Sequence, residues 1–210
     1  MYKRQRKDGE RVSFLSTDIE VQITTHAQVG SGNDIASTTV AARKLLDILR
    51  ALPDSGDVSL TLANKRMTVQ SGKSRFALQT LAAEEFPTVA QAEQYNAKVT
   101  LPQKTLKHLF NMVHFSMAQQ DIRYYLNGLL LVVDGKNVIA VATDGHRLAF
   151  CQVATEQEFP RQEVIIPRKT IIELQRLLEE NDQPVDLEIA NNQVKLCLLY
   201  TSDAADDMQC

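Results

Sequence analysis

The chain has 210 residues, enough for one large domain or for two modest domains that each bury a core of their own. Apolar residues make up 44% of it, and no apolar run approaches the roughly 20 residues of a membrane-spanning helix. The net charge of -3 excludes a uniformly basic nucleic-acid binder, but it is compatible with a local basic surface.

The cysteines and the opening segment indicate the compartment. Cys151, Cys197 and Cys210 are widely spaced and odd in number, so they suggest neither a zinc cluster nor a disulfide framework. The charged residues at the start have no apolar stretch behind them, which argues against a signal peptide. We therefore expect a protein of the reducing cytoplasm that needs no metal and no cofactor.

The two ends of the chain resemble translations of one short DNA element. Residues 1–5 and 197–210 are similar to the products of the two strands of an adapter used in sequencing libraries. A natural acidic tail is the alternative for the second segment. We interpret both ends as lying outside the fold, so the acidic cluster in the tail is no metal-site candidate.

A unit of a short strand, a basic residue pair or single lysine, and an amphipathic helix occurs three times. The copies cover residues 38–52, 98–110 and 163–178. Alternating apolar and polar residues follow the first and third helices, at 58–62 and 185–189, and predict strands there. Because a helix with one apolar stripe packs on one face of a sheet, we predict an α+β fold with helices on antiparallel sheets.

Polar residues and short side chains at 88–96 predict a linker between two domains. Domain one then covers residues 6–96 and domain two covers 97–196. Both look incomplete, because the first lacks a leading helix unit and the second stops within a sheet.

All three helices begin with cations, namely Arg43 with Lys44, Lys104, and Arg168 with Lys169. The first turn of a helix favours acidic residues, because the helix dipole is positive there. A shared anionic partner such as a phosphate backbone explains the recurrence, and a plain solvated face is the alternative.

Several segments resemble signature segments of the bacterial DNA sliding clamp, the beta subunit of DNA polymerase III. They are residues 71–76, 85–87, 116–128, 142–149 and 164–169, and the similarity extends over 11–196. The resemblance implies a ring of such domains around duplex DNA, with helices lining the hole and a sheet outside. A third clamp domain of that family is absent from this sequence.

The resemblance also implies site residues. DNA contact is expected at Arg43, Gln120, Tyr124 and Tyr125, with Arg123, Arg168 and Lys169 as weaker candidates. From the residues alone, two adjacent tyrosines that enter a strand are more often half core and half surface.

A pocket for short peptides is implied at Arg123, Leu126, Thr143, Gly145, His146, Arg147 and Leu148, and its other wall belongs to the missing domain. A subunit interface is implied at Lys44, Phe76 and Leu78, although alternation alone allows Phe76 and Leu78 to be core residues. The third-domain surface is missing here, so a homodimer is expected of the full-length family and not of this chain.

The expected function is a non-catalytic processivity factor, and not an enzyme. The implied partners are double-stranded DNA, the polymerase III catalytic subunit, the clamp loader and other proteins with clamp-binding motifs. A metal-dependent nuclease or nucleotidyl transferase that uses Asp18 and Asp144 is one alternative, and a peptide-binding adaptor without a DNA role is another. We interpret Asp144 and Gly145 as a tight turn, because His146 lacks a second metal ligand or a partner base.

Overall fold

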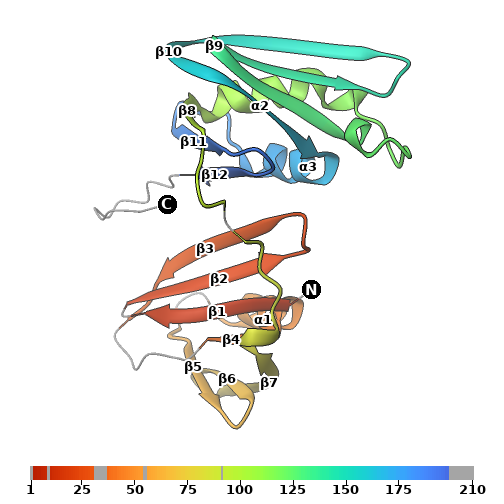
Figure 1. The fold of residues 1–210 in the computed structure, drawn as a ribbon. Coiled ribbons are helices and arrows are strands. Elements are labelled where there is room, and N and C mark those ends of the chain that lie inside the picture. Colours follow the sequence, from red (N-terminus) through yellow and green to blue (C-terminus); the bar gives the residue numbers. More distant parts are fainter. Residues whose placement is uncertain (1, 9, 31–36, 54–55, 91, 199–210) are drawn as a thin grey trace. The chain divides into compact units, whose positions relative to one another are not determined.

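The computed structural model describes residues 2–8, 10–30, 37–53, 56–90 and 92–198 (Figure 1). They form two compact units, Met1–Ala90 and Gln91–Cys210. The division falls inside the predicted linker. Both units combine antiparallel strands with helices, which confirms the α+β prediction.

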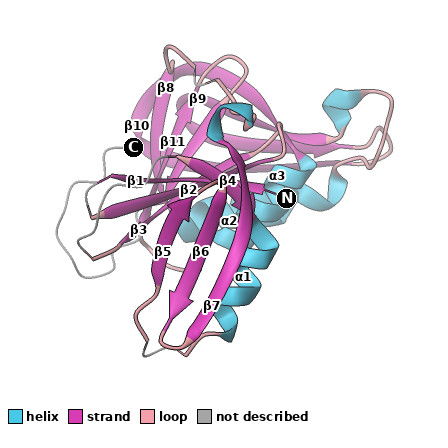
Figure 2. Ribbon diagram, turned by 90° about the horizontal axis from the view of Figure 1, so that it is seen from below, coloured by secondary structure: helices cyan, strands magenta, loops and turns pink. Residues whose placement is uncertain are grey.

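Unit 1 is a single seven-stranded antiparallel sheet with the strand order β3-β2-β1-β4-β7-β6-β5. Its elements are β1 (Tyr2–Asp8), β2 (Arg11–Thr17), β3 (Gln22–Gln28), β4 (Thr38–Ala41), α1 (Ala42–Ala51), β5 (Ser59–Ala63), β6 (Arg66–Ser71), β7 (Ser74–Ala82) and the short helix η1 (Ala83–Glu85). Helix α1 follows β4 directly and lies along the sheet beside β7 (Figure 2).

The core of unit 1 is small. It consists of Val40, Leu45, Leu52, Met67, Val69 and Leu78. In β6 the residues alternate between buried and less buried, so Met67 and Val69 face α1's side of the sheet. Leu45 is the buried residue of α1, while Leu46 and Leu49 are exposed.

Residues 2–5 lie within this sheet, which corrects their exclusion from the fold. They pair on one side with β2 and on the other with β4, for example Lys3 with Ser16 and with Val40. The pairing uses main-chain groups that β2 and β4 would otherwise leave unsatisfied. Gln5 is buried, and its Nε2 donates to Met67 Sδ at 3.0 Å. An adapter origin for these residues stays a prediction.

At the other end, Cys197 and Leu198 close strand β12 (Val194–Leu198), and Cys197 is buried. The fold therefore continues two residues past the predicted limit at 196. The remainder of the predicted tail, residues 199–210, lies outside the described residues.

Unit 2 contains two sheets, β10-β9 and β12-β11-β8. Besides β12, its elements are β8 (Ala97–Pro102), α2 (Gln103–Val113), η2 (His114–Ser116), η3 (Tyr124–Leu126), β9 (Gly128–Thr143), β10 (Leu148–Pro167), α3 (Arg168–Leu177) and β11 (Pro184–Ile189). The first half of β9 pairs with the end of β10, and its second half pairs with the start of β10. The turn at residues 144–147 joins them.

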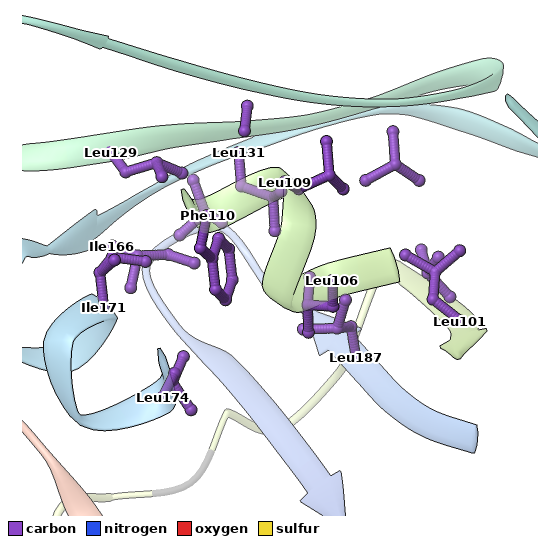
Figure 3. Close-up of a cluster of buried hydrophobic side chains, with 14 of the residues drawn as sticks. Leu101, Leu106, Leu109, Phe110, Leu129, Leu131, Ile166, Ile171, Leu174 and Leu187 are labelled. Atoms are coloured by element: carbon purple, nitrogen blue, oxygen red, sulfur yellow. The ribbon is translucent and has the colours of Figure 1, made fainter. Parts of the chain in front are cut away.

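Helices α2 and α3 supply one side of the unit 2 core. Leu106, Leu109 and Phe110 of α2 and Ile171 of α3 are fully buried against Leu129, Leu131 and Leu187 of the strands (Figure 3). Burying one such side chain contributes about 1.5–3 kcal/mol. This larger core fixes the ends of β9 and β10, next to which several of the predicted site residues of unit 2 lie.

Candidate nucleic-acid and peptide interface

The segment 117–127, here called the 117–127 loop, connects η2 to β9. Its ends are joined by a hydrogen bond from Ala118 N to Leu126 O at 3.0 Å. Inside the loop, Asn127 Oδ1 accepts from Asp121 N at 2.9 Å, and Asn127 Nδ2 donates to Asp121 O at 2.8 Å. Gln120 has a φ of 58°, in the left-handed region. The loop is therefore a closed, internally bonded structure.

Tyr124 and Tyr125 form the exposed tip of η3. They are 82% and 50% exposed, and their rings meet edge to face with centroids 5.8 Å apart. The buried residue of this turn is the next one, Leu126. Neither tyrosine belongs to the core, so the alternative of a half-core pair does not apply. Ile122, which no sequence pattern had indicated, is 99% exposed close to them in the chain.

Arg123 lies between the loop and the turn at 143–147. Its Nε and Nη2 donate to the two carboxylate oxygens of Asp121 at 3.0 and 2.9 Å. These hydrogen bonds lower the pKa of Asp121 to about 2. A Cβ on Gly145 would lie 3.2 Å from Arg123 Nη2, so the guanidinium rests against the glycine backbone. Arg123 thus brings the loop against the turn.

The turn itself is held by two side chains. Thr143 Oγ1 donates to Arg147 O at 2.7 Å and accepts from Gly145 N at 3.1 Å. Asp144 Oδ1 accepts from the main-chain N–H groups of His146 and Arg147, both at 3.0 Å. Those two bonds are the main causes of a lowered Asp144 pKa. Asp144 therefore shapes the backbone, which confirms the tight-turn interpretation.

Arg147 is fixed from three sides. Its Nε donates to Asp144 Oδ2 at 3.0 Å, its Nη2 donates to Phe115 O at 2.8 Å, and its guanidinium carbon lies 5.8 Å from the centre of the Phe115 ring. Phe115 was missed in the sequence. The available signal was a large apolar residue directly after the last turn of an amphipathic helix.

A hollow of about 430 Å³ adjoins Arg147. It is lined by Phe115, Met117, Ala118, Gln119, Gln120, Asp121, Asp144, His146 and Arg147. It brings together Gln120 of the expected DNA set and His146 and Arg147 of the expected peptide set. Three other expected peptide residues, Arg123, Thr143 and Gly145, contact residues that line the hollow or lie next to them in the same turn, without lining it themselves. Leu126 is buried, and Leu148 is 65% exposed at the start of β10.

The cations at the helix starts are mostly exposed to solvent. Arg43, Lys44, Lys104 and Lys169 are exposed, and Lys107 is half-buried. Lys104 and Lys107 form ion pairs with Asp182 and Glu180. No first turn of α1, α2 or α3 contains an acidic residue.

Arg168 is half-buried and turned toward the protein. Its Nη1 donates to the main-chain oxygens of Met117 and His114 at 3.3 and 3.4 Å. These are long hydrogen bonds, but they direct one side of the guanidinium to the start of the 117–127 loop.

The expected subunit-interface residues differ in burial. Leu78 is buried in the unit 1 core, opposite Met67. Phe76, two residues earlier on β7, is 37% exposed. Leu78 is therefore a core residue, as alternation alone allowed, and Phe76 and Lys44 are the exposed members of the set.

The two carboxylates of the nuclease alternative occupy equivalent turns in separate units. Asp18 Oδ1 accepts from Val21 N at 2.8 Å, much as Asp144 does in its own turn. Among the described residues, no group of three or more His, Cys, Asp or Glu side chains is arranged to hold a metal ion. Within the same residues, no helix is long and apolar enough to cross a membrane.

Comparisons with known proteins assign the two units to successive domains of one protein family. Residues 6–90 match the model of the DNA polymerase III beta subunit, N-terminal domain, and residues 100–201 match the model of its central domain. The beta sliding clamps of Haemophilus influenzae and Escherichia coli are 42% and 41% identical to the chain, over 93% and 96% of its length.

Solved structures give the same result. A crystal structure of the DNA polymerase III subunit beta from Pseudomonas aeruginosa has a TM-score of 0.89 and 37% identity, and covers 94% of this chain and 54% of its own. A clamp from the same organism bound to griselimycin has a TM-score of 0.85. The chain spans about half the length of the curated relatives it matches, 54% and 56% for the two above. The chain belongs to the DNA polymerase III beta subunit family, the beta sliding clamps.

Proposed function

We propose that this chain forms part of a DNA sliding clamp, a non-catalytic ring that keeps a replicative polymerase on duplex DNA in the cytoplasm. The observation that carries the proposal is the 117–127 loop. It presents Gln120, Tyr124 and Tyr125 to solvent on a backbone closed by its own hydrogen bonds. A preformed loop of this kind loses little conformational entropy when it meets a rigid duplex.

The chemistry of the loop suits contact without sequence reading. An amide and two phenol groups can hydrogen-bond phosphate oxygens, and such contacts position a protein on DNA but carry no base information. We propose Arg43 and Lys169 as additional electrostatic contacts, because both are exposed at helix starts that carry partial positive charge. The half-buried Arg168 instead supports the start of the 117–127 loop through its hydrogen bond to Met117 O.

Peptide docking is the second part of the proposal. The hollow beside Arg147, which has apolar, polar and charged side chains in its lining, and the exposed Leu148 offer a surface for one side of a short peptide. A related clamp has been solved with griselimycin bound. We propose the polymerase III catalytic subunit, the clamp loader and other clamp-motif proteins as partners, with the remaining wall supplied by a third domain. Assembly into a homodimeric ring is proposed only for the full-length protein.

The test asks whether the protein is linked to DNA as a closed ring around it. Residues 6–198 of this chain replace the matching segment in a full-length relative, and the hybrid is loaded onto nicked circular plasmid by the relative's clamp loader. We expect the hybrid to stay on circular DNA through gel filtration at moderate salt and to be lost when the plasmid is linearised, since a ring slides off free ends. Equal retention on circular and linear DNA would contradict the clamp proposal and indicate ordinary electrostatic binding.

No observation favours the nuclease. Asp18 and Asp144 each use their carboxylate to hold a turn. Two-metal chemistry needs carboxylates that share a metal, and the described residues contain no group of three or more His, Cys, Asp or Glu side chains arranged to hold one.

A further inference from the structure

Asn127 occupies the junction between the 117–127 loop and strand β9. Its side chain pairs with both main-chain groups of Asp121, accepting from N at 2.9 Å and donating to O at 2.8 Å. A carboxamide carries a donor and an acceptor side by side, and an aspartate of the same shape carries acceptors only. These two hydrogen bonds close the loop in the way that a pair of main-chain hydrogen bonds joins two residues of neighbouring antiparallel strands.

The main chain of Asn127 extends the same connection. Its N–H donates to Tyr124 O at 3.0 Å, and its oxygen accepts from Arg168 N, the first residue of α3, at 2.9 Å. The Arg168 guanidinium then reaches back to Met117 O at the start of the loop. One residue therefore links the loop, the tyrosine turn and the N-terminus of a core helix.

The neighbouring backbone needs this support. Gln120 directly precedes Asp121 and has a φ of 58°, a conformation that costs a residue with a Cβ roughly 1 kcal/mol or more. Such a conformation persists only where the surroundings determine it. The pairing with Asn127 fixes the peptide units on both sides of Asp121, and the Asp121 carboxylate in turn holds Arg123.

We infer that Asn127 is a positioning residue for DNA contact: it sets the direction in which Gln120, Tyr124 and Tyr125 face the duplex, without touching DNA itself. This inference rests on the proposed function. Asn127 is half-buried, whereas the residues that it positions are exposed. It adds no charge, so its effect on affinity is separable from that of a cation.

The experiment measures binding of a fluorescein-labelled duplex to the 210-residue chain by anisotropy, between low and moderate salt. We expect Asn127→Ala to weaken binding about fivefold to tenfold through lost preorganisation, with the salt slope unchanged because no phosphate-neutralising cation is removed. The second background is a chain in which Gln120, Tyr124 and Tyr125 are all alanine. There, Asn127→Ala should have little further effect, since the contacts it positions are gone.

Asn111→Ala is the matched control. Asn111 accepts a hydrogen bond from Gln175 Nε2 at 2.7 Å between α2 and α3, so the variant loses a comparable bond outside the loop. We expect it to bind DNA like the original chain. If Asn127→Ala does not fold, Asn127→Asp keeps the acceptor for Asp121 N and replaces the donor by a charged acceptor oxygen that faces Asp121 O, with Asn111→Asp as its charge control. It should weaken binding in the same direction.

The outcomes separate the two proposals. If the original chain and the triple-alanine chain bind duplex equally, or if neither binds, the loop of this chain does not contact DNA and the inference fails; the clamp proposal is decided separately, by retention on circular against linear plasmid. If the triple-alanine change weakens binding and Asn127→Ala does not, the inference alone is wrong. An equal loss from Asn127→Ala in both backgrounds would likewise overturn it, because that pattern means general destabilisation.

Discussion

The same turn occurs once in each unit, at residues 17–21 and 143–147. In the first, Thr17 Oγ1 donates to Val21 O at 3.0 Å and accepts from Ile19 N at 3.1 Å, and Asp18 Oδ1 accepts from Val21 N at 2.8 Å. The second repeats each of these bonds with Thr143 and Asp144. The Thr-Asp pair is therefore a structural device that both units share.

The two turns differ at their third residue. Ile19 has a φ of 82° and is 75% exposed, while Gly145 has a φ of 88° and lies under the Arg123 guanidinium. Since an isoleucine adopts nearly the same φ in the first turn, the backbone conformation alone does not require glycine in the second. The close approach of Arg123 adds that requirement. The Thr-Asp pair therefore forms the turn in both units, whereas the contact between Gly145 and Arg123 is specific to the candidate site.

Gly145→Ile tests this separation and has the largest expected effect. The new side chain would combine left-handed strain with a clash against Arg123, at a cost of about 2–4 kcal/mol in the free energy of unfolding. Urea denaturation followed by circular dichroism measures it. Gly145→Ile combined with Arg123→Ala is the control, and it should recover the part that comes from the clash. No recovery would mean that backbone strain accounts for the whole effect.

Ile19→Gly is the reverse change in unit 1 and should be mildly stabilising. Glycine removes the left-handed strain of a β-branched residue, about 1–2 kcal/mol, but raises the entropy of the unfolded chain by up to about 1 kcal/mol. We expect a net gain of roughly 0.5 kcal/mol in the same denaturation assay. Ile19→Ala, which keeps a Cβ at positive φ, should gain less than glycine; an equal or larger gain would argue against strain at this position.

The smallest expected effect is the loss of loop stability at acid pH. Hydrogen bonds from Arg123 hold the pKa of Asp121 at about 2, below the unfolded value of about 3.9. A depressed folded pKa means that this pair stabilises the loop above pH 4 and that the contribution is lost as pH falls from about 4 to 2. The contribution is small because the pair is solvent-exposed.

Carbon-13 NMR of the Asp121 carboxyl should show a midpoint near 2, which moves up toward 3.9 in Arg123→Ala. A midpoint near 3.9 in the original chain would show that the pair does not form in solution.

The sequence predicted the features that depend on periodicity. The three strand–helix units appear as β4–α1, β8–α2 and β10–α3, with helices that begin at Ala42, Gln103 and Arg168. It also predicted the turn at Asp144, because the Thr-Asp repeat is visible in the residues. These patterns involve residues that are close together in the sequence. The helices, strands and turns that they predict are likewise formed by hydrogen bonds between nearby residues.

The sequence did not predict features that depend on single long-range contacts. The role of Asn127 was not predicted. Its side-chain amide hydrogen-bonds the main chain of Asp121, six residues earlier, and such a contact produces no periodic pattern in the sequence. Phe115 was missed because its role comes from Arg147, far along the chain. Leu126 was expected in a pocket wall but is buried at the base of the loop.

The position of β1 has a consequence for sequence tolerance. Every pair that joins β1 to β4 involves residues 2–5, so a chain shortened by these residues would have its seven-stranded sheet divided into two ladders with open edges. Yet the pairing is made by the backbone, and Gln5 is buried with an Oε1 that has no partner among the described residues. A strand that contributes mainly main-chain hydrogen bonds tolerates many different residues. The requirement is that they adopt an extended conformation and include no proline.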